Sequence, residues 1–286
     1  MANKKLKAPV NIPVEKIHPF EGHPYKVLDN DEMNTLIESI QHKGVISPIV
    51  VRPLENTEDE YEIISGHRRL RASVKAGLET VPALIYAVSR DEAAIILVDS
   101  NLHREHIFPS EKAFAYKLKL EAIKRQGERT DLTSRQVVGK LESADIVSET
   151  ESGRQVQRYI RLTNLIPELL DLVDEERIAF TPAVELSYLN EVEQADLVEE
   201  IRVCDATPNL SQAQRLRAIS REEGLTPEHI GEILSEEKAN QREKIKIPAE
   251  RIRKYFPKSY TTEQIEEAII KICESRYRAR RDRDAR

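Results

Sequence analysis

The sequence predicts an α+β protein, in which a small mixed α/β unit precedes an all-helical region and a short helical C-terminal module. Eight of the 14 prolines lie in the first 110 residues, together with most of the short β-branched runs. The remainder shows one amphipathic helical pattern after another. A chain of 286 residues is long enough for two or three domains. Their cores must be mostly aliphatic, because aromatics make up 5% of the residues and Trp is absent.

Three short apolar runs in the first part have strand length and are bounded by Pro, Gly or charged residues. Two helical patterns alternate with them, and Gly44 and Gly77 follow these patterns where a glycine ends a helix. We therefore expect strands at 46–52, 61–65 and 81–86, and helices at 31–43 and 67–76.

Helical patterns continue from residue 91 onward. Gly127 is placed to end the pattern at 110–126. Thr133 with Gln136, and Ser152 with Gln155, have the spacing of a capping box at a helix start. The expected helices are 92–101, 110–126, 133–141, 152–165, 211–223, 227–242 and 262–277. The resulting domains are 10–108, 109–240 and 241–286.

The charge distribution limits the class of protein. The net charge of −6 argues against a surface that coats nucleic acid or anionic lipid as a whole. Residues 165–200 contain eleven acidic residues and only one basic residue, Arg177, so local basic faces remain elsewhere. Cys204 and Cys273 have no partners at metal-ligand spacing, which excludes a zinc finger or disulfide scaffold. With no apolar run of about 18 residues, we expect a cytoplasmic protein without a membrane partner.

The segment 64–72, ISGHRRLRA, joins an apolar strand to a basic helix start through Gly66. Such a turn suits an anion, because the glycine allows close backbone approach and the first helical amides point outward. Arg68, Arg69 and Arg71 add donors for phosphate oxygens. A solvated basic first turn explains the pattern equally well.

A second polar segment, DSNLHR at 99–104, ends a predicted helix. Asn101 and Arg104 are candidate ligand-binding residues. Oxygen ligands for Mg²⁺ are available at Asp99, Ser100 and Asn101. His103 and His106 have the spacing of a metal-binding pair, but no further His or Cys is near, so ordinary polar surface is favoured.

The predicted helix at 152–165 has two distinct faces at about 100° per residue. Its apolar face can dock on a core, while its basic face can present Arg and Gln to a DNA major groove. A solvated basic helix is the alternative, and the acidic connection at 142–151 is longer than a simple helix-turn-helix turn. The apolar face comprises Val156, Tyr159, Ile160 and Thr163. The candidate DNA-binding residues are Arg135, Gln136, Arg154, Gln155, Gln157, Arg158 and Arg161.

Several sequence blocks in order resemble the N-terminal half of ParB-type (ParB/RepB) partition proteins. They are VNIPVEKIHPF, ESIQHKGVISPIVVRP, YEIISGHRRLRASVKAGLETVPALI and DSNLHREHIFPSEKAFAYKLKL, within residues 10–125. The following region, with LTSRQVVGKL and AFTPAVELSYL, resembles the helix-turn-helix domain of the same family. Ordered blocks are far more specific than any single motif.

The resemblance implies an N-terminal domain that binds CTP and Mg²⁺, with the nucleotide gating closure of a homodimer into a clamp on DNA. It also implies partition of a chromosome, plasmid or mobile element, a ParA-type ATPase as partner, and nucleoid or plasmid association. By position, 44–48 would lie by the base. The implied nucleotide-binding residues are Gly44, Ser47, Pro48, Gly66, His67, Arg68, Arg69, Arg71, Asn101 and Arg104.

Three positions depart from the family pattern. His67 replaces a Glu after the Gly, Ser100 a Glu before the Asn, and Ser47 a Gln before the Pro. Loss of the Glu beside Asn101 removes a carboxylate that would position metal or water, although Asp99 is one residue away. CTP binding is therefore better supported than hydrolysis, and a weak CTPase activity is left open.

Two other functions compete with the partition clamp. One is a transcription regulator that has the fold but no nucleotide switch. The other is a phosphotransferase of the same fold, which would need a carboxylate base such as Glu62 or Asp99. A sulfiredoxin-like reaction needs a Cys where His67 stands.

The C-terminal segment combines an apolar helical pattern with a basic tail. From residue 271 onward the chain has seven basic and three acidic residues. We expect a self-association helix or a docked terminal helix. Its apolar stripe comprises Ile265, Ala268, Ile269 and Ile272.

Overall fold

A computed structural model describes residues 8–55, 57–104, 106–131, 147–148, 151–236, 252–257, 260–261, 264–265, 267–274 and 276. The chain divides into two compact units, Met1–Glu236 and Glu237–Arg286. Within the described residues, no helix combines the length and apolar character needed to cross a bilayer.

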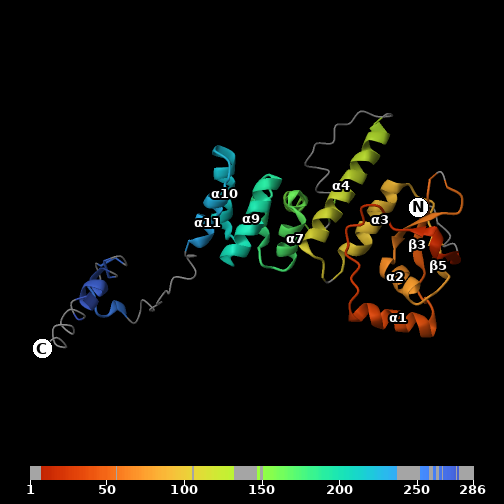
Figure 1. Cartoon of the computed structure of the whole chain (residues 1–286), viewed down its shortest axis with the longest axis horizontal. Coiled ribbons are helices and arrows are strands. Elements are labelled where there is room, and N and C mark those ends of the chain that lie inside the picture. The colour runs from red at the N-terminus through yellow and green to blue at the C-terminus, as the bar shows by residue number, and fades with distance from the viewer. Residues whose placement is uncertain are drawn as a thin grey trace. The chain divides into compact units, whose positions relative to one another are not determined.

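A mixed five-stranded sheet forms the N-terminal part of the first unit (Figure 1). In spatial order the strands are β1 Val10–Pro13, β5 Thr80–Ile85, β3 Ile49–Pro53, β4 Tyr61–Ser65 and β2 Ile17–His18. The central strand β3 runs parallel to β5 and antiparallel to β4. The outer strands β1 and β2 were not expected, because they are short and are fixed by pairing with distant residues rather than by their own pattern.

Two helices, α2 His67–Lys75 and α3 Arg90–Leu102, contact this sheet, and α1 Asp31–Lys43 packs on α2. The α/β architecture predicted from the sequence is confirmed. Helix α3 starts two residues before its predicted start, because Ser89 and Glu92 form a complete capping box. The sheet core consists of Ile12, Ile17, Ile49, Val51, Ile63, Val81 and Ala83.

Helix α4, Pro109–Asp131, leads into the helical region (Figure 1). The prediction that Gly127 ends this helix is wrong, since the helix continues through it. An isolated glycine lowers helix stability by only about 1 kcal/mol relative to Ala. The predicted helix at 133–141, with Arg135 and Gln136, lies outside the described residues.

The helical region packs around an aliphatic core with members such as Leu162, Leu169, Leu197 and Leu216. The helices of this region are α6 Gly153–Arg161, α7 Pro167–Asp174, α8 Phe180–Leu186, α9 Glu191–Cys204, α10 Leu210–Glu222 and α11 Pro227–Ser235. The helix predicted at 152–165 ends earlier than expected, because a 3-10 turn over Leu162–Asn164 follows α6.

The acidic span at 165–200 is not simply a solvated surface. Glu193 is 5% exposed. Its carboxylate accepts hydrogen bonds from Ser220 Oγ at 2.8 Å and from the Leu225 backbone N–H at 3.0 Å. Part of the negative charge therefore joins helices within the core.

The second unit is described in part. Residues 264–265, 267–274 and 276 are helical, in agreement with the predicted C-terminal helix. Ile265 is buried, whereas Ile272 is exposed. The arginine-rich tail from 277 onward lies outside the described residues.

Candidate functional site

Gly66 makes the turn between β4 and α2. Its backbone has φ of 101°, in the left-handed region that side chains rarely adopt. A Cβ at this position would lie 2.9 Å from Ile49 Cγ2 and 3.1 Å from Arg69 Nη2. The chain therefore needs a glycine here, because a side chain would be strained at this φ and would collide with Ile49 and Arg69.

A pocket of about 230 Å³ opens beside this turn. Three segments form it: the loop between β2 and α1, the start of α2, and the end of α3. The structure thus brings the two polar motifs of the sequence together. The pocket is lined by His23, Tyr25, Lys26, Val27, Ser65, Gly66, His67, Arg68, Arg69, Asn101 and Arg104.

Arginines give this pocket its charge. Arg69 Nη1 donates to the carbonyl oxygens of Ser47 at 2.6 Å and Pro48 at 2.7 Å. Ser47 and Pro48 do not line the pocket, nor does Gly44, but Arg69 connects their loop to it. Arg68 Nη2 contacts the exposed Glu32 carboxylate at 2.9 Å. Burial lowers the pKa of Arg69.

Arg71, in contrast, is not brought to the pocket. It makes a two-point contact with Asp29, at 2.8 and 2.5 Å, and Lys75 Nζ lies 2.8 Å from the same carboxylate. Two residues along a helix correspond to a rotation of about 200°, which turns Arg71 away from Arg69. Its predicted phosphate contact has no support in this geometry.

Two histidines in the pocket wall stack on each other. The ring centroids of His23 and His67 are 3.7 Å apart with an interplanar angle of 33°. Burial lowers the pKa of His23 to about 4 and that of His67 to about 3, so both rings are uncharged near neutral pH. The sequence pattern missed His23, Tyr25 and Lys26. Only the clustering of polar and aromatic residues in HPYK, outside any periodic element, could have indicated them.

The predicted Mg²⁺ ligands do not converge. Asp99 Oδ1 accepts from Lys119 Nζ at 2.6 Å, and Ser100 Oγ donates to the Leu97 carbonyl at 3.0 Å. Asn101 alone of the three lines the pocket. Across the described part of the chain, no group of three His, Cys, Asp or Glu side chains is placed to hold a metal.

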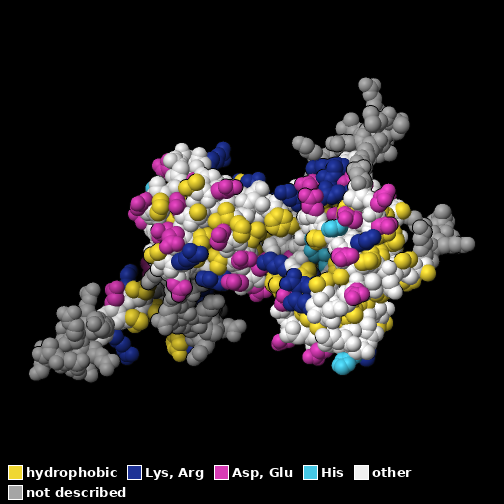
Figure 2. Space-filling model, turned by 45° about the vertical axis from the view of Figure 1, so that its right-hand side comes forward, with side chains coloured by type: hydrophobic (Ala, Val, Ile, Leu, Met, Phe, Trp, Pro, Cys, Tyr) yellow, Lys and Arg dark blue, Asp and Glu magenta, His cyan; other side chains and the backbone are white. Residues whose placement is uncertain are grey.

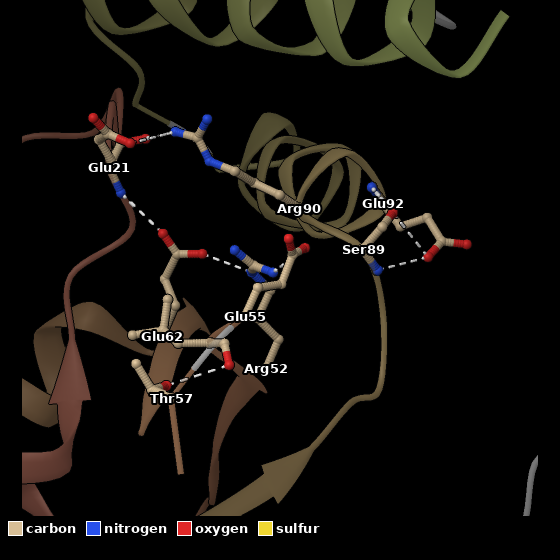
Figure 3. A network of polar contacts seen from close by, with 9 residues as sticks. Glu21, Arg52, Glu55, Thr57, Glu62, Ser89, Arg90 and Glu92 are labelled. Atoms are coloured by element: carbon tan, nitrogen blue, oxygen red, sulfur yellow. Dashed lines mark hydrogen bonds and ion pairs between the residues drawn. The ribbon is translucent and has the colours of Figure 1, made fainter. Parts of the chain in front are cut away.

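Glu62, a candidate base for phosphoryl transfer, is committed elsewhere (Figure 3). It is 4% exposed, and its carboxylate accepts from Arg52 Nε at 2.6 Å and from the Glu21 backbone N–H at 3.2 Å. The pair with Arg52 is a buried structural ion pair. Among the described residues, no carboxylate lines the pocket.

Helix α6 confirms the predicted apolar face. Val156 is fully buried, and Tyr159 and Ile160 pack against a cluster containing Tyr116 and Leu120 of α4. Ser152 Oγ accepts from the Gln155 backbone N–H at 3.3 Å, as the capping pattern predicts.

The basic face of α6 divides in two. Arg154 and Gln157 are exposed. Arg158, however, donates to Thr181 Oγ1 at 3.1 Å and lies over the Phe180 ring at 5.0 Å. Arg161 donates to the Ser187 carbonyl at 3.2 Å and lies over the Tyr188 ring at 3.9 Å. Figure 2 shows basic side chains in small groups on the face in view, not in one continuous stripe.

Comparisons with known proteins identify related chains. The family model for the ParB N-terminal domain matches residues 2–102. A nucleoid occlusion protein of Listeria innocua is 35% identical over 67% of this chain and 62% of its own length. Another from Listeria monocytogenes is 33% identical over 66% of this chain and 67% of its own. The matches thus span about two thirds of these relatives.

One solved structure is that of a C-terminally truncated ParB from Caulobacter crescentus complexed with CTP-γ-S. It is 25% identical, covers 68% of this chain and 99% of its own, and has a TM-score of 0.33. Because so low a score does not establish a shared overall arrangement, the relationship rests on the sequence relatives.

Proposed function

This chain belongs to the ParB family, and we propose that it is a sequence-specific DNA-binding protein whose hold on DNA is gated by CTP. The observation that carries the proposal is the convergence of the Gly66 turn, Arg68, Arg69, Asn101 and Arg104 in one pocket. These residues come from two motifs about 35 residues apart, and together they supply positive charge and hydrogen-bond donors for several phosphate groups.

The pocket fits the nucleotide better than it fits a metal. Gly66 and the first residues of α2 line the cavity, and Arg68, Arg69 and Arg104 give it the positive charge that a polyphosphate needs. Bound CTP would supply a polyphosphate that these groups orient and a base beside the loop that Arg69 holds. Of the proposed Mg²⁺ ligands only Asn101 lines the pocket, so the proposal includes no hydrolysis of the nucleotide.

DNA recognition is assigned to α6 and to the helix expected before it. Arg154 and Gln157 are exposed on a helix whose opposite face is buried, which suits insertion into a major groove. From family membership we further propose that the chain acts in partition or nucleoid occlusion. On the same ground it forms a homodimer, has a ParA-type ATPase as partner and associates with the nucleoid or a plasmid.

The phosphotransferase alternative loses its candidate bases, since Glu62 is bound to Arg52 and Asp99 to Lys119. An experiment distinguishes the CTP-gated protein from a transcription regulator without nucleotide control. DNA fragments selected by the purified full chain would provide a cognate site. That site would then be placed on duplexes with either blocked or free ends.

We expect CTP to cause salt-resistant retention on the blocked duplex and much less on the duplex with a free end. The Arg69→Ala variant should still recognise the site at low salt but should not be retained. Equal retention with and without CTP would contradict the gated clamp and favour the regulator.

A further inference from the structure

Lys26 belongs both to the pocket wall and to a contact with the helical region. The residue lines the cavity beside Arg68, Arg69 and Arg104. Its ammonium nevertheless lies 3.2 Å from Asp171 Oδ1 and 3.1 Å from Asp174 Oδ2, both on α7. One cation is therefore shared between two separate parts of the molecule.

The backbone of Lys26 is held independently of this ammonium. Its N–H donates to Glu111 Oε1 at 2.7 Å, and the other oxygen of Glu111 accepts from the Phe108 N–H at 3.2 Å. Glu111 is 5% exposed, at the start of α4. The anchored backbone leaves the side chain as the part that can change partners.

The acidic partners can also lose the ammonium without being left unsatisfied. Asp174 Oδ1 accepts from the Ser110 N–H at 3.0 Å, and Asp174 Oδ2 accepts from Ser110 Oγ at 2.5 Å. Both oxygens of this 6%-exposed carboxylate thus keep a donor. Asp171 is 64% exposed and would be solvated. Of the two ion pairs, the one between Lys26 and Asp171 is exposed and is therefore held only weakly in water.

We propose that Lys26 is a phosphate-binding residue whose ammonium exchanges between the α7 carboxylates and a polyphosphate in the pocket. This inference rests on the proposed nucleotide site. An anion bound in the pocket breaks the ion pairs between Lys26 and α7, and those ion pairs in turn weaken binding of the anion. The two interactions share one cation, so each lowers the affinity of the other by the same factor.

The test uses calorimetric titration of the full chain with CTP, ATP and inorganic tripolyphosphate. Asp171→Asn should tighten CTP and tripolyphosphate about two- to fivefold, since it weakens the competing pair. Glu168→Gln, on the exposed surface of the same helix, is the matched control and should leave both affinities unchanged. Lys26→Met should weaken both by about tenfold or more, as expected when a charged hydrogen bond is lost.

The double variant decides the mechanism. If Lys26 mediates the effect, Asp171→Asn should change nothing in the Lys26→Met background. An equal gain in Asp171→Asn and Glu168→Gln, or a gain that persists without Lys26, would overturn the exchange. Tripolyphosphate binding with no preference for CTP over ATP would instead contradict the proposed function while leaving the exchange intact. If neither CTP nor tripolyphosphate bound, both the proposed function and the exchange of Lys26 would be contradicted.

Discussion

The arginines of the pocket and those of α6 are held in different ways. Arg69 is fixed by two backbone carbonyls, and among the described residues no carboxylate lines the cavity to neutralise its charge. Arg158 and Arg161 instead rest on the aromatic rings of Phe180 and Tyr188. The pocket is thus pre-organised for an anion, whereas α6 keeps part of its basic face folded against the protein and exposes only Arg154 and Gln157.

The largest effect that would sharpen this contrast is expected from Arg69→Ala. Removing a guanidinium from a pre-formed anion pocket should weaken CTP binding by about 2–5 kcal/mol. Arg71→Ala is the matched control, because Arg71 is paired with Asp29 outside the pocket, and it should have little effect. Titration calorimetry measures both, and comparable losses in the two variants would contradict the assignment.

The turn that shapes the pocket can be tested through Gly66→Ala. Its positive φ and the predicted contact with Ile49 should lower the free energy of unfolding by about 2–3 kcal/mol. Gly77→Ala has a φ of 77° but nothing within 4 Å of the added Cβ, so it should be milder. Denaturant unfolding followed by circular dichroism compares the two, and equal losses would show that the close contact is irrelevant.

On α6, the exposed and the packed arginine should respond differently. Arg154→Ala should weaken binding to the selected site by about 1–3 kcal/mol if Arg154 contacts a base, while stability changes by less than about 0.5 kcal/mol. Arg158→Ala should in addition lower the stability of the protein by about 0.5–1 kcal/mol, because the contact of Arg158 with the Phe180 ring is lost. Fluorescence anisotropy with labelled duplex and thermal unfolding separate these losses. Unchanged DNA affinity in Arg154→Ala would remove α6 as the recognition helix.

The smallest effect concerns the stacked histidines. Burial lowers the pKa of His67 to about 3, so the unfolded chain binds more protons than the folded chain between that value and about 6.5. Stability is therefore full above about pH 6.5 and falls on acidification, by about 1–2 kcal/mol at pH 5.

His67→Gln should flatten this dependence in urea unfolding at pH 7 and pH 5. Carboxylates elsewhere titrate in both proteins, so the difference between the two profiles isolates the histidine. Parallel profiles would show that His67 is not buried in its neutral form.

Local patterns predicted most of the fold. Apolar runs located β3, β4 and β5, and helix-ending glycines placed α1 and α2. The outer strands β1 and β2 were not predicted, because two to four residues are too few to show a strand periodicity. The helix end predicted at Gly127 was wrong, because the helical preference of the neighbouring residues outweighs the cost of one glycine.

The site was predicted where residues are adjacent in sequence and missed where the tertiary structure assembles it. Gly66, Arg69 and Asn101 belong to short motifs, whereas His23 and Lys26 reach the pocket from a distant loop. The contact of Asp99 was missed for the same reason, since no local pattern indicates that Lys119, twenty residues away, donates to its carboxylate.

The measurement that addresses the nucleotide pocket most directly is amide hydrogen exchange of the full chain with and without CTP. Protection should concentrate in three segments, 23–27, 65–69 and 101–104, because these line the cavity. Arg69→Ala should abolish the protection in all three together. CTP-dependent protection confined to other parts of the chain, or none at all, would contradict a nucleotide site at the Gly66 turn.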